Sequence, residues 1–121
     1  MTKYYYENVP VIYPAGTLLS VRFMSRFQHV GIATGYGSVI HSSGRFGQVS
    51  ETSQEKFSQG TPIKVIPYET DLSGAEIVAR ARGKMGQRYG VFTRNCVHFV
   101  NWVITGKAKS RQLGPLDLRK Y

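Results

Sequence analysis

The strongest constraint on the fold is a pair of short apolar segments, residues 28–34 and 38–42, that flank the sequence Gly35-Tyr36-Gly37. Two strand-like segments around a glycine-containing turn predict a β-hairpin. Each arm carries one histidine, His29 or His41. Because side chains alternate between the faces of a strand, a three-residue loop places both histidines on one face and a two-residue loop separates them. The glycines favour the three-residue loop.

Two imidazoles on one face of neighbouring strands can serve as a base and the group that orients it. The simpler interpretation is that each histidine is a polar residue at the end of a strand. For either histidine alone, this simpler interpretation is preferred. A chemical role for the pair therefore needs a third group.

The only cysteine, Cys96, lies where a helix is predicted to begin. Asn95 is a suitable N-cap and Gly106 a suitable stop. Between them, apolar residues recur at helical spacing: Phe99, Val100, Val103 and Ile104. Unpaired backbone N–H groups and the helix dipole favour a thiolate in the first turn. Cys96 thus occupies the position of a nucleophile, although a single cysteine is more simply a small buried hydrophobic residue.

His98 follows Cys96 by two positions in the same predicted helix. Two residues correspond to about 200° of rotation around a helix. Its side chain is therefore expected to point away from the thiol, and we interpret it as a structural residue.

The charge of the chain is strongly positive and unevenly distributed. Sixteen Lys and Arg residues stand against seven Asp and Glu, for a net charge of +9. Ten of those cations lie at or after Arg80, where Asp117 is the only acid. Such a field favours an anionic partner such as a phospholipid surface, although a solvated basic face is an equally good interpretation. Nucleic acid is the weaker option, because no nucleic-acid-binding motif accompanies the charge.

The 121 residues suit a single domain over residues 1–121. One cysteine cannot form an internal disulfide, which favours a reducing compartment, and we expect a cytoplasmic protein. The sequence has neither a signal-peptide pattern at its start nor an apolar run of about 20 residues. Nothing in it specifies an oligomeric state.

Other segments predict elements around the hairpin. Strands are expected near residues 17–23 and 63–66. The sequences Thr52-Ser53-Gln54-Glu55 and Ser73-Gly74-Ala75-Glu76 both have capping-box spacing, which predicts a short helix ending near Gly60 and a longer one ending near Gly86. In the longer helix, Arg80 and Lys84 are four residues apart and are expected on the exposed side.

With these residues in place, the sequence resembles a known family, the lecithin:retinol acyltransferase-like proteins, which include the H-Rev107-type phospholipase/acyltransferases. The stretch from His29-Val30-Gly31-Ile32 to His41 is similar to their H-box, including the spacing of its two histidines. Asn95-Cys96-Val97-His98-Phe99-Val100 is similar to their Asn-Cys-Glu-His-Phe-Val box. The resemblance covers roughly residues 17–112, and the same boxes occur in picornaviral 2A proteins of the H-box/NC type.

The resemblance implies an α+β, circularly permuted papain-like fold of the NlpC type, in which an antiparallel sheet packs against a cysteine-bearing helix. It also implies that Cys96 is the nucleophile, that His29 is its base and that His41 orients His29. This is the arrangement of thiol catalysis through an acyl-cysteine intermediate. It implies no cofactor and no metal.

The implied function is that of a thiol acyltransferase or hydrolase acting on phospholipid or another acyl ester. The basic C-terminal half suggests peripheral contact with an anionic membrane. Two alternatives stay open at this point: a cysteine peptidase or amidase, as in the wider superfamily, and a non-catalytic, 2A-like module that binds an anionic partner. Val97 departs from the family box, where an acidic residue follows the cysteine, so substrate specificity does not carry over.

Overall fold

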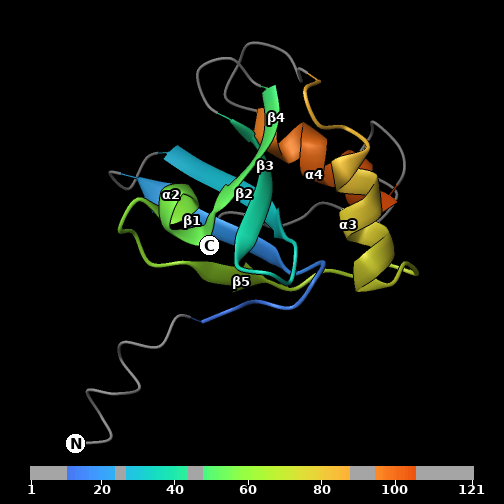
Figure 1. Cartoon of the computed structure of the whole chain (residues 1–121), viewed down its shortest axis with the longest axis horizontal. Helices are drawn as coiled ribbons and strands as arrows, with labels where there is room; N and C mark the ends of the chain where they lie inside the picture. The colour runs from blue at the N-terminus through green and yellow to red at the C-terminus, as the bar shows by residue number, and fades with distance from the viewer. Residues whose placement is uncertain (1–10, 24–26, 44–47, 88–94, 106–121) are drawn as a thin grey trace, which may run out of the picture.

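The computed structural model describes residues 11–23, 27–43, 48–87 and 95–105 (Figure 1). Within these ranges the elements are β1 (Leu18–Phe23), β2 (Phe27–Ala33), β3 (Ser38–Ser43), β4 (Gln48–Ser53), α2 (Gln54–Ser58), β5 (Lys64–Ile66), α3 (Gly74–Arg82) and α4 (Asn95–Thr105). None of the helices in these ranges has the length and apolarity needed to span a bilayer.

The strands form one five-stranded sheet in the order β4-β3-β2-β1-β5, and every neighbouring pair is antiparallel. Strands β1 to β4 follow one another across the sheet, whereas β5 returns to the opposite edge beside β1. The predicted α+β class is confirmed, with an antiparallel sheet packed against α4, the helix that contains Cys96.

The hairpin between β2 and β3 has the predicted three-residue loop. The loop residues are Gly35, Tyr36 and Gly37, and the backbone N–H of Thr34 donates to the carbonyl of Ser38 across its base at 3.0 Å. Gly35 and Gly37 have φ angles of 94° and 89°, which glycine adopts without a steric penalty. The odd loop length sets the register of the two arms.

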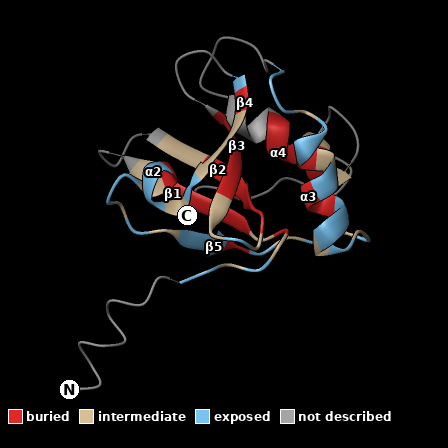
Figure 2. Ribbon diagram, in the orientation of Figure 1, coloured by how far each residue is buried: buried red, intermediate tan, exposed pale blue. Residues whose placement is uncertain are grey.

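Two apolar clusters cover opposite faces of the sheet, and buried residues run along the central strands and along α3 and α4 (Figure 2). The cluster beneath α3 and α4 consists of Leu18, Val30, Ile32, Ile40, Val49, Ile66, Ile77, Val78, Ala81, Phe99, Val100, Val103 and Ile104. The cluster on the α2 side consists of Leu19, Val21, Ala33, Val39 and Phe57. Neighbouring strand residues thus belong to different clusters, as the period of two requires.

Helix α3 begins as predicted, and α2 begins one residue later than its capping-box spacing indicates. In α3, the Ser73 side chain and the Glu76 side chain complete a capping box. In α2, Ser53 is the N-cap and its hydroxyl accepts from the backbone N–H of Lys56 at 3.1 Å. Thr52 is therefore not the capping residue and remains in strand β4.

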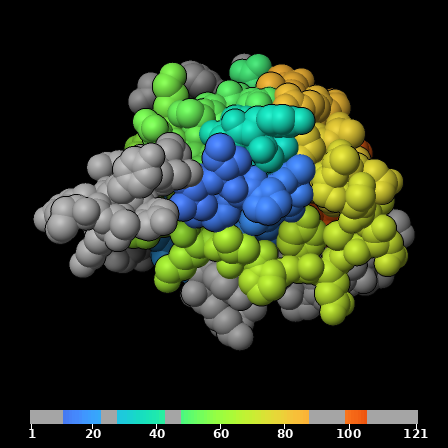
Figure 3. Space-filling model, turned by 60° about the horizontal axis from the view of Figure 1, so that its bottom comes forward, coloured from blue at the N-terminus to red at the C-terminus, as the bar shows by residue number. Residues whose placement is uncertain are grey.

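The segment before β1 packs closely against the start of α3. A β-carbon on Gly74 would lie 2.1 Å from the carbonyl oxygen of Ala15, so only glycine fits at this position. The hydroxyl of Tyr68 donates to the carbonyl of Gly16. In Figure 3 the blue N-terminal segment lies directly against yellow-green residues of the middle of the chain. The contact fixes the entry into β1 against α3.

Arg80 and Lys84 do not lie on an open, solvated face, contrary to the expectation from their spacing. The Arg80 guanidinium donates to the carbonyls of Val103 at 2.8 Å and Trp102 at 3.1 Å, near the C-terminus of α4. Its central carbon also lies 4.7 Å from the centroid of the Trp102 ring, and Lys84 Nζ lies 3.9 Å from it. These cations stabilise α4 through its carbonyls and through cation–π contacts.

Arg82 is the third cation of the basic C-terminal half that the structure describes. It pairs with Glu51 at 2.5 Å. The three cations at 80, 82 and 84 therefore have internal partners, and the remaining cations of that half, including Lys107, Lys109 and Arg111, lie outside the described residues.

Candidate active site

His29 and His41 meet on one face of the sheet, as the hairpin register predicts. His29 Nε2 and His41 Nδ1 are 2.7 Å apart, which is a hydrogen-bonding distance. The rings pack edge to face, with centroids 4.7 Å apart and planes at 87°. The structure thus brings together the two histidines that the sequence places on different strands.

The absence of a side chain at Gly31 makes room for this pair. A β-carbon there would lie 2.6 Å from a methyl group of Val39 and 3.1 Å from the β-carbon of His41. The first contact is shorter than real β-carbons show and the second is tighter than most, so any larger residue at position 31 would push on Val39 and crowd His41. Among the described residues, β2 and β3 pair next to the loop, where Ile32 lies opposite Ile40 and Ala33 opposite Val39.

Phe57 of α2 forms an apolar wall against both imidazoles. Its ring centroid lies 5.3 Å from each of the rings of His29 and His41. Burial lowers the pKa of His29 from 6.5 to about 4. Burial also lowers the pKa of His41 to about 3, and repulsion from a charged His29 contributes to that shift. Both rings are therefore neutral near pH 7, and neutral imidazole is the form that can accept a proton.

A third side chain, Thr52 of β4, extends the pair. Its hydroxyl oxygen lies 3.0 Å from His41 Nε2. The sequence reasoning missed this residue, because it assigned Thr52 to the capping box. Strand alternation carries the signal that could have found it: Thr52 pairs with Val39 in the register of β3 and β4, two positions from His41 and on the same face.

Cys96 lies in the first turn of α4, in agreement with the predicted helix. Its side chain, like those of Asn95, Val97 and His98, lies outside the described residues. The described apolar side chains of α4 pack in the cluster with Val30, Ile32 and Ile40. The histidines contact Phe57, which belongs to the cluster on the other face. The described apolar side chains of α4 and the histidine pair therefore lie on opposite faces of the sheet.

A comparison with protein families identifies the family of this chain. The family model described as lecithin retinol acyltransferase matches residues 13–109, which is most of the chain and includes His29, His41 and Cys96. The chain belongs to the lecithin retinol acyltransferase family. No curated protein matches it significantly in sequence. Family membership suggests an acyltransferase- or phospholipase-type activity, while the extent of a single domain over residues 1–121 stays a prediction.

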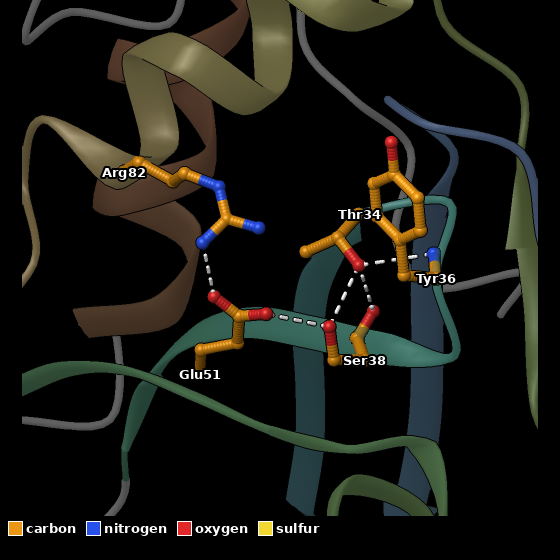
Figure 4. Close-up of polar contacts among 5 residues, drawn as sticks. All are labelled: Thr34, Tyr36, Ser38, Glu51 and Arg82. Carbon is orange, nitrogen blue, oxygen red and sulfur yellow. Dashed lines mark hydrogen bonds and ion pairs between the residues drawn. The ribbon is translucent and has the colours of Figure 1, made fainter.

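A polar network of this family member links β4, the hairpin loop and α3 on the face of the sheet opposite the histidine pair (Figure 4). The Glu51 carboxylate accepts from Arg82 at 2.5 Å and from the hydroxyl of Ser38 at 2.6 Å. The Ser38 hydroxyl in turn lies 2.7 Å from that of Thr34, which accepts from the backbone N–H of Tyr36 at 3.2 Å. The network ties α3 and β4 to the hairpin loop, and Glu51 is the neighbour of Thr52 in β4.

Among the described residues, no group of three or more His, Cys, Asp and Glu side chains could hold a metal ion.

Proposed function

We propose that this chain is a thiol acyltransferase or hydrolase that acts on phospholipid or another acyl ester. In this proposal Cys96 is the nucleophile, His29 is its base and His41 orients His29. The observation that carries the proposal is the 2.7 Å hydrogen bond between His29 Nε2 and His41 Nδ1. It uses one nitrogen of His29, and the other, Nδ1, has no hydrogen-bond partner among the residues that the structure describes.

The reaction begins with a proton transfer and ends with the acyl group on sulfur. His29 Nδ1 accepts the proton of the Cys96 thiol, and the thiolate attacks the ester carbonyl to form a tetrahedral oxyanion. The oxyanion collapses, the C–O bond to the leaving alcohol breaks, and His29 returns the proton to the leaving oxygen. The product of this half-reaction is an acyl-cysteine thioester.

The second half-reaction releases the acyl group. Water or an amine attacks the thioester while His29 takes its proton, and the proton then returns to the Cys96 sulfur as the C–S bond breaks. Water as the acceptor gives a free fatty acid, and an amine gives an amide. Backbone N–H groups in the first turn of α4 are available to stabilise both oxyanions, because helix N-termini leave such groups unpaired.

The electrostatics of the histidine pair supports the role of His29. The pKa of His29 is lowered to about 4 by burial, so the base form is present throughout the physiological pH range. A thiolate beside the ring reverses part of that effect, because an opposite charge stabilises the imidazolium. His29 therefore accepts a proton only when the thiolate forms next to its ring.

Lipid turnover is the direct test of this proposal. We expect wild-type protein incubated with vesicles of phosphatidylcholine and phosphatidylserine to release fatty acid and lysophospholipid, and to form N-acyl products when an amine is added. Liquid chromatography with mass spectrometry measures all three products. The Cys96→Ala variant is the blank and should form none of them. Absence of lipid products together with cleavage of peptide substrates would replace this proposal with an amidase, and absence of all turnover would favour a binding module.

A further inference from the structure

We propose that Thr52 is a positioning residue that fixes the direction of the hydrogen-bond chain from Thr52 through His41 to His29. The proposal rests on the proposed function, in which His29 must offer a free lone pair to the thiol. It adds a member on β4 to the histidine pair on β2 and β3. The chain consists of two hydrogen bonds, one of 3.0 Å from Thr52 Oγ1 to His41 Nε2 and one of 2.7 Å from His41 Nδ1 to His29 Nε2.

The two possible directions of this chain have opposite chemical consequences. If His41 Nε2–H donates to Thr52, then His41 Nδ1 accepts from His29 Nε2–H, and His29 Nδ1 carries a lone pair. If the Thr52 hydroxyl donates to His41 instead, then His41 Nδ1–H donates to His29 Nε2, and His29 Nδ1 carries a hydrogen. Only the first direction leaves His29 able to accept a proton at Nδ1, because each neutral imidazole holds one N–H.

The surroundings of the Thr52 hydroxyl favour the first direction. The carbonyl of Ser53 lies 3.3 Å from the Thr52 hydroxyl oxygen and can accept its hydrogen, and a hydroxyl that donates to Ser53 turns a lone pair to His41 Nε2 at 3.0 Å. The Ser53 hydroxyl is used separately, because it accepts from the backbone N–H of Lys56 as the cap of α2. Two adjacent hydroxyls in the sequence thus have two different tasks.

His41 depends on Thr52 because the site offers it little else. His41 is buried, with 7 % of its surface exposed. In the described part of the chain its hydrogen-bond and ring partners are His29, Phe57 and Thr52, and none of these is a carboxylate. A neutral hydroxyl selects the tautomer without the strong stabilisation of positive charge that a carboxylate would give. A hydroxyl partner therefore suits a histidine pair that is neutral until His29 accepts the thiol proton.

No proton has to move along the hydrogen-bond chain from Thr52 to His29 during the proposed reaction. When His29 gains the thiol proton at Nδ1, its Nε2–H already donates to His41, and His41 Nε2–H already donates to Thr52. The positive charge on His29 is stabilised by an acceptor that is in place beforehand, which is the advantage of a preorganised site.

Imidazole nitrogen spectra test this direction without any substrate. We would record long-range ¹H–¹⁵N correlations of ¹⁵N-histidine-labelled protein at pH 7, with signals assigned through His29→Gln and His41→Gln variants. The expected result for the wild type is that both histidines carry hydrogen on Nε2 and a lone pair on Nδ1. Hydrogen on Nδ1 of either ring would overturn the proposal. Because this readout needs no turnover, it holds or fails independently of the acyl chemistry.

Three threonine variants then test whether Thr52 is the cause. Thr52→Val keeps the shape and removes the acceptor, and we expect mixed tautomers at His41 and a kcat lower by about tenfold with KM little changed. Thr52→Ser restores the hydroxyl and should restore both. Thr34→Val is the matched control, because it removes the hydroxyl of a buried threonine in the Glu51 network away from the histidines. Unchanged tautomers in folded Thr52→Val, or an equal change in Thr34→Val, would contradict the proposal.

Discussion

Replacing His29 with glutamine is expected to lower kcat/KM for acyl transfer by about 10²- to 10⁴-fold, the usual contribution of a positioned general base. Glutamine keeps polarity and similar size but cannot accept the thiol proton. The rate at which iodoacetamide alkylates Cys96 at pH 7 should fall as well, because the thiolate fraction decreases. Initial rates on phospholipid vesicles and the alkylation rate constant together measure the effect.

The third histidine provides the matched control for this substitution. His98 is predicted to point away from the thiol, so His98→Gln should retain most of the alkylation rate of a folded wild type. Equal losses in both variants would show that the effect is a general disturbance of the fold. Retention of full turnover by folded His29→Gln would remove His29 from the mechanism.

Lowering the pH from 7 to 5 is expected to decrease the free energy of unfolding by about 4 kcal/mol, with about 2 from each of His29 and His41. Burial places their pKa values near 4 and near 3 in the folded chain, against 6.5 when unfolded. Between pH 6.5 and pH 4 the unfolded chain therefore binds protons that the folded chain does not. Stability is lost as the pH falls through this window, and it is fully present above pH 6.5.

Urea unfolding at pH 7 and pH 5 measures this decrease. The control is the double variant His29→Gln/His41→Gln, in which the difference between the two pH values should largely disappear. The capping carboxylate of Glu76 contributes little to this comparison, because hydrogen bonds from Ser73 lower its pKa below 4.5. A wild type as stable at pH 5 as at pH 7 would mean that the histidines are not buried in neutral form.

Features encoded by nearby residues could be predicted from the sequence. The hairpin loop of Gly35, Tyr36 and Gly37 fixes a register, and that register places His29 and His41 on one face with no further information. Ser73 and Glu76 complete a capping box within one turn of helix. In both cases the residues that determine the structure are within a few positions of one another. The local sequence pattern therefore predicts the turn or the helix start directly.

Features that depend on distant parts of the chain could not be predicted in this way. Thr52 fits the capping-box pattern, but its hydroxyl bonds to His41 while Ser53 caps the helix. Arg80 has the spacing of a solvated face, yet it binds carbonyls of α4 more than twenty residues away. In each case a tertiary partner competes with the local pattern and prevails, because it offers a hydrogen-bonding group that the local sequence does not reveal.

The most direct test of the acyl-cysteine mechanism is the intact mass of the protein after incubation with mixed phospholipids or with a short-chain thioester. This mechanism predicts a single acyl increment on the wild type that hydroxylamine removes and that Cys96→Ala does not acquire. That result would place the acyl group on the Cys96 sulfur and reveal the preferred chain. An increment of equal size on Cys96→Ala, or none on a wild type that still turns over lipid, would contradict the acyl-cysteine mechanism.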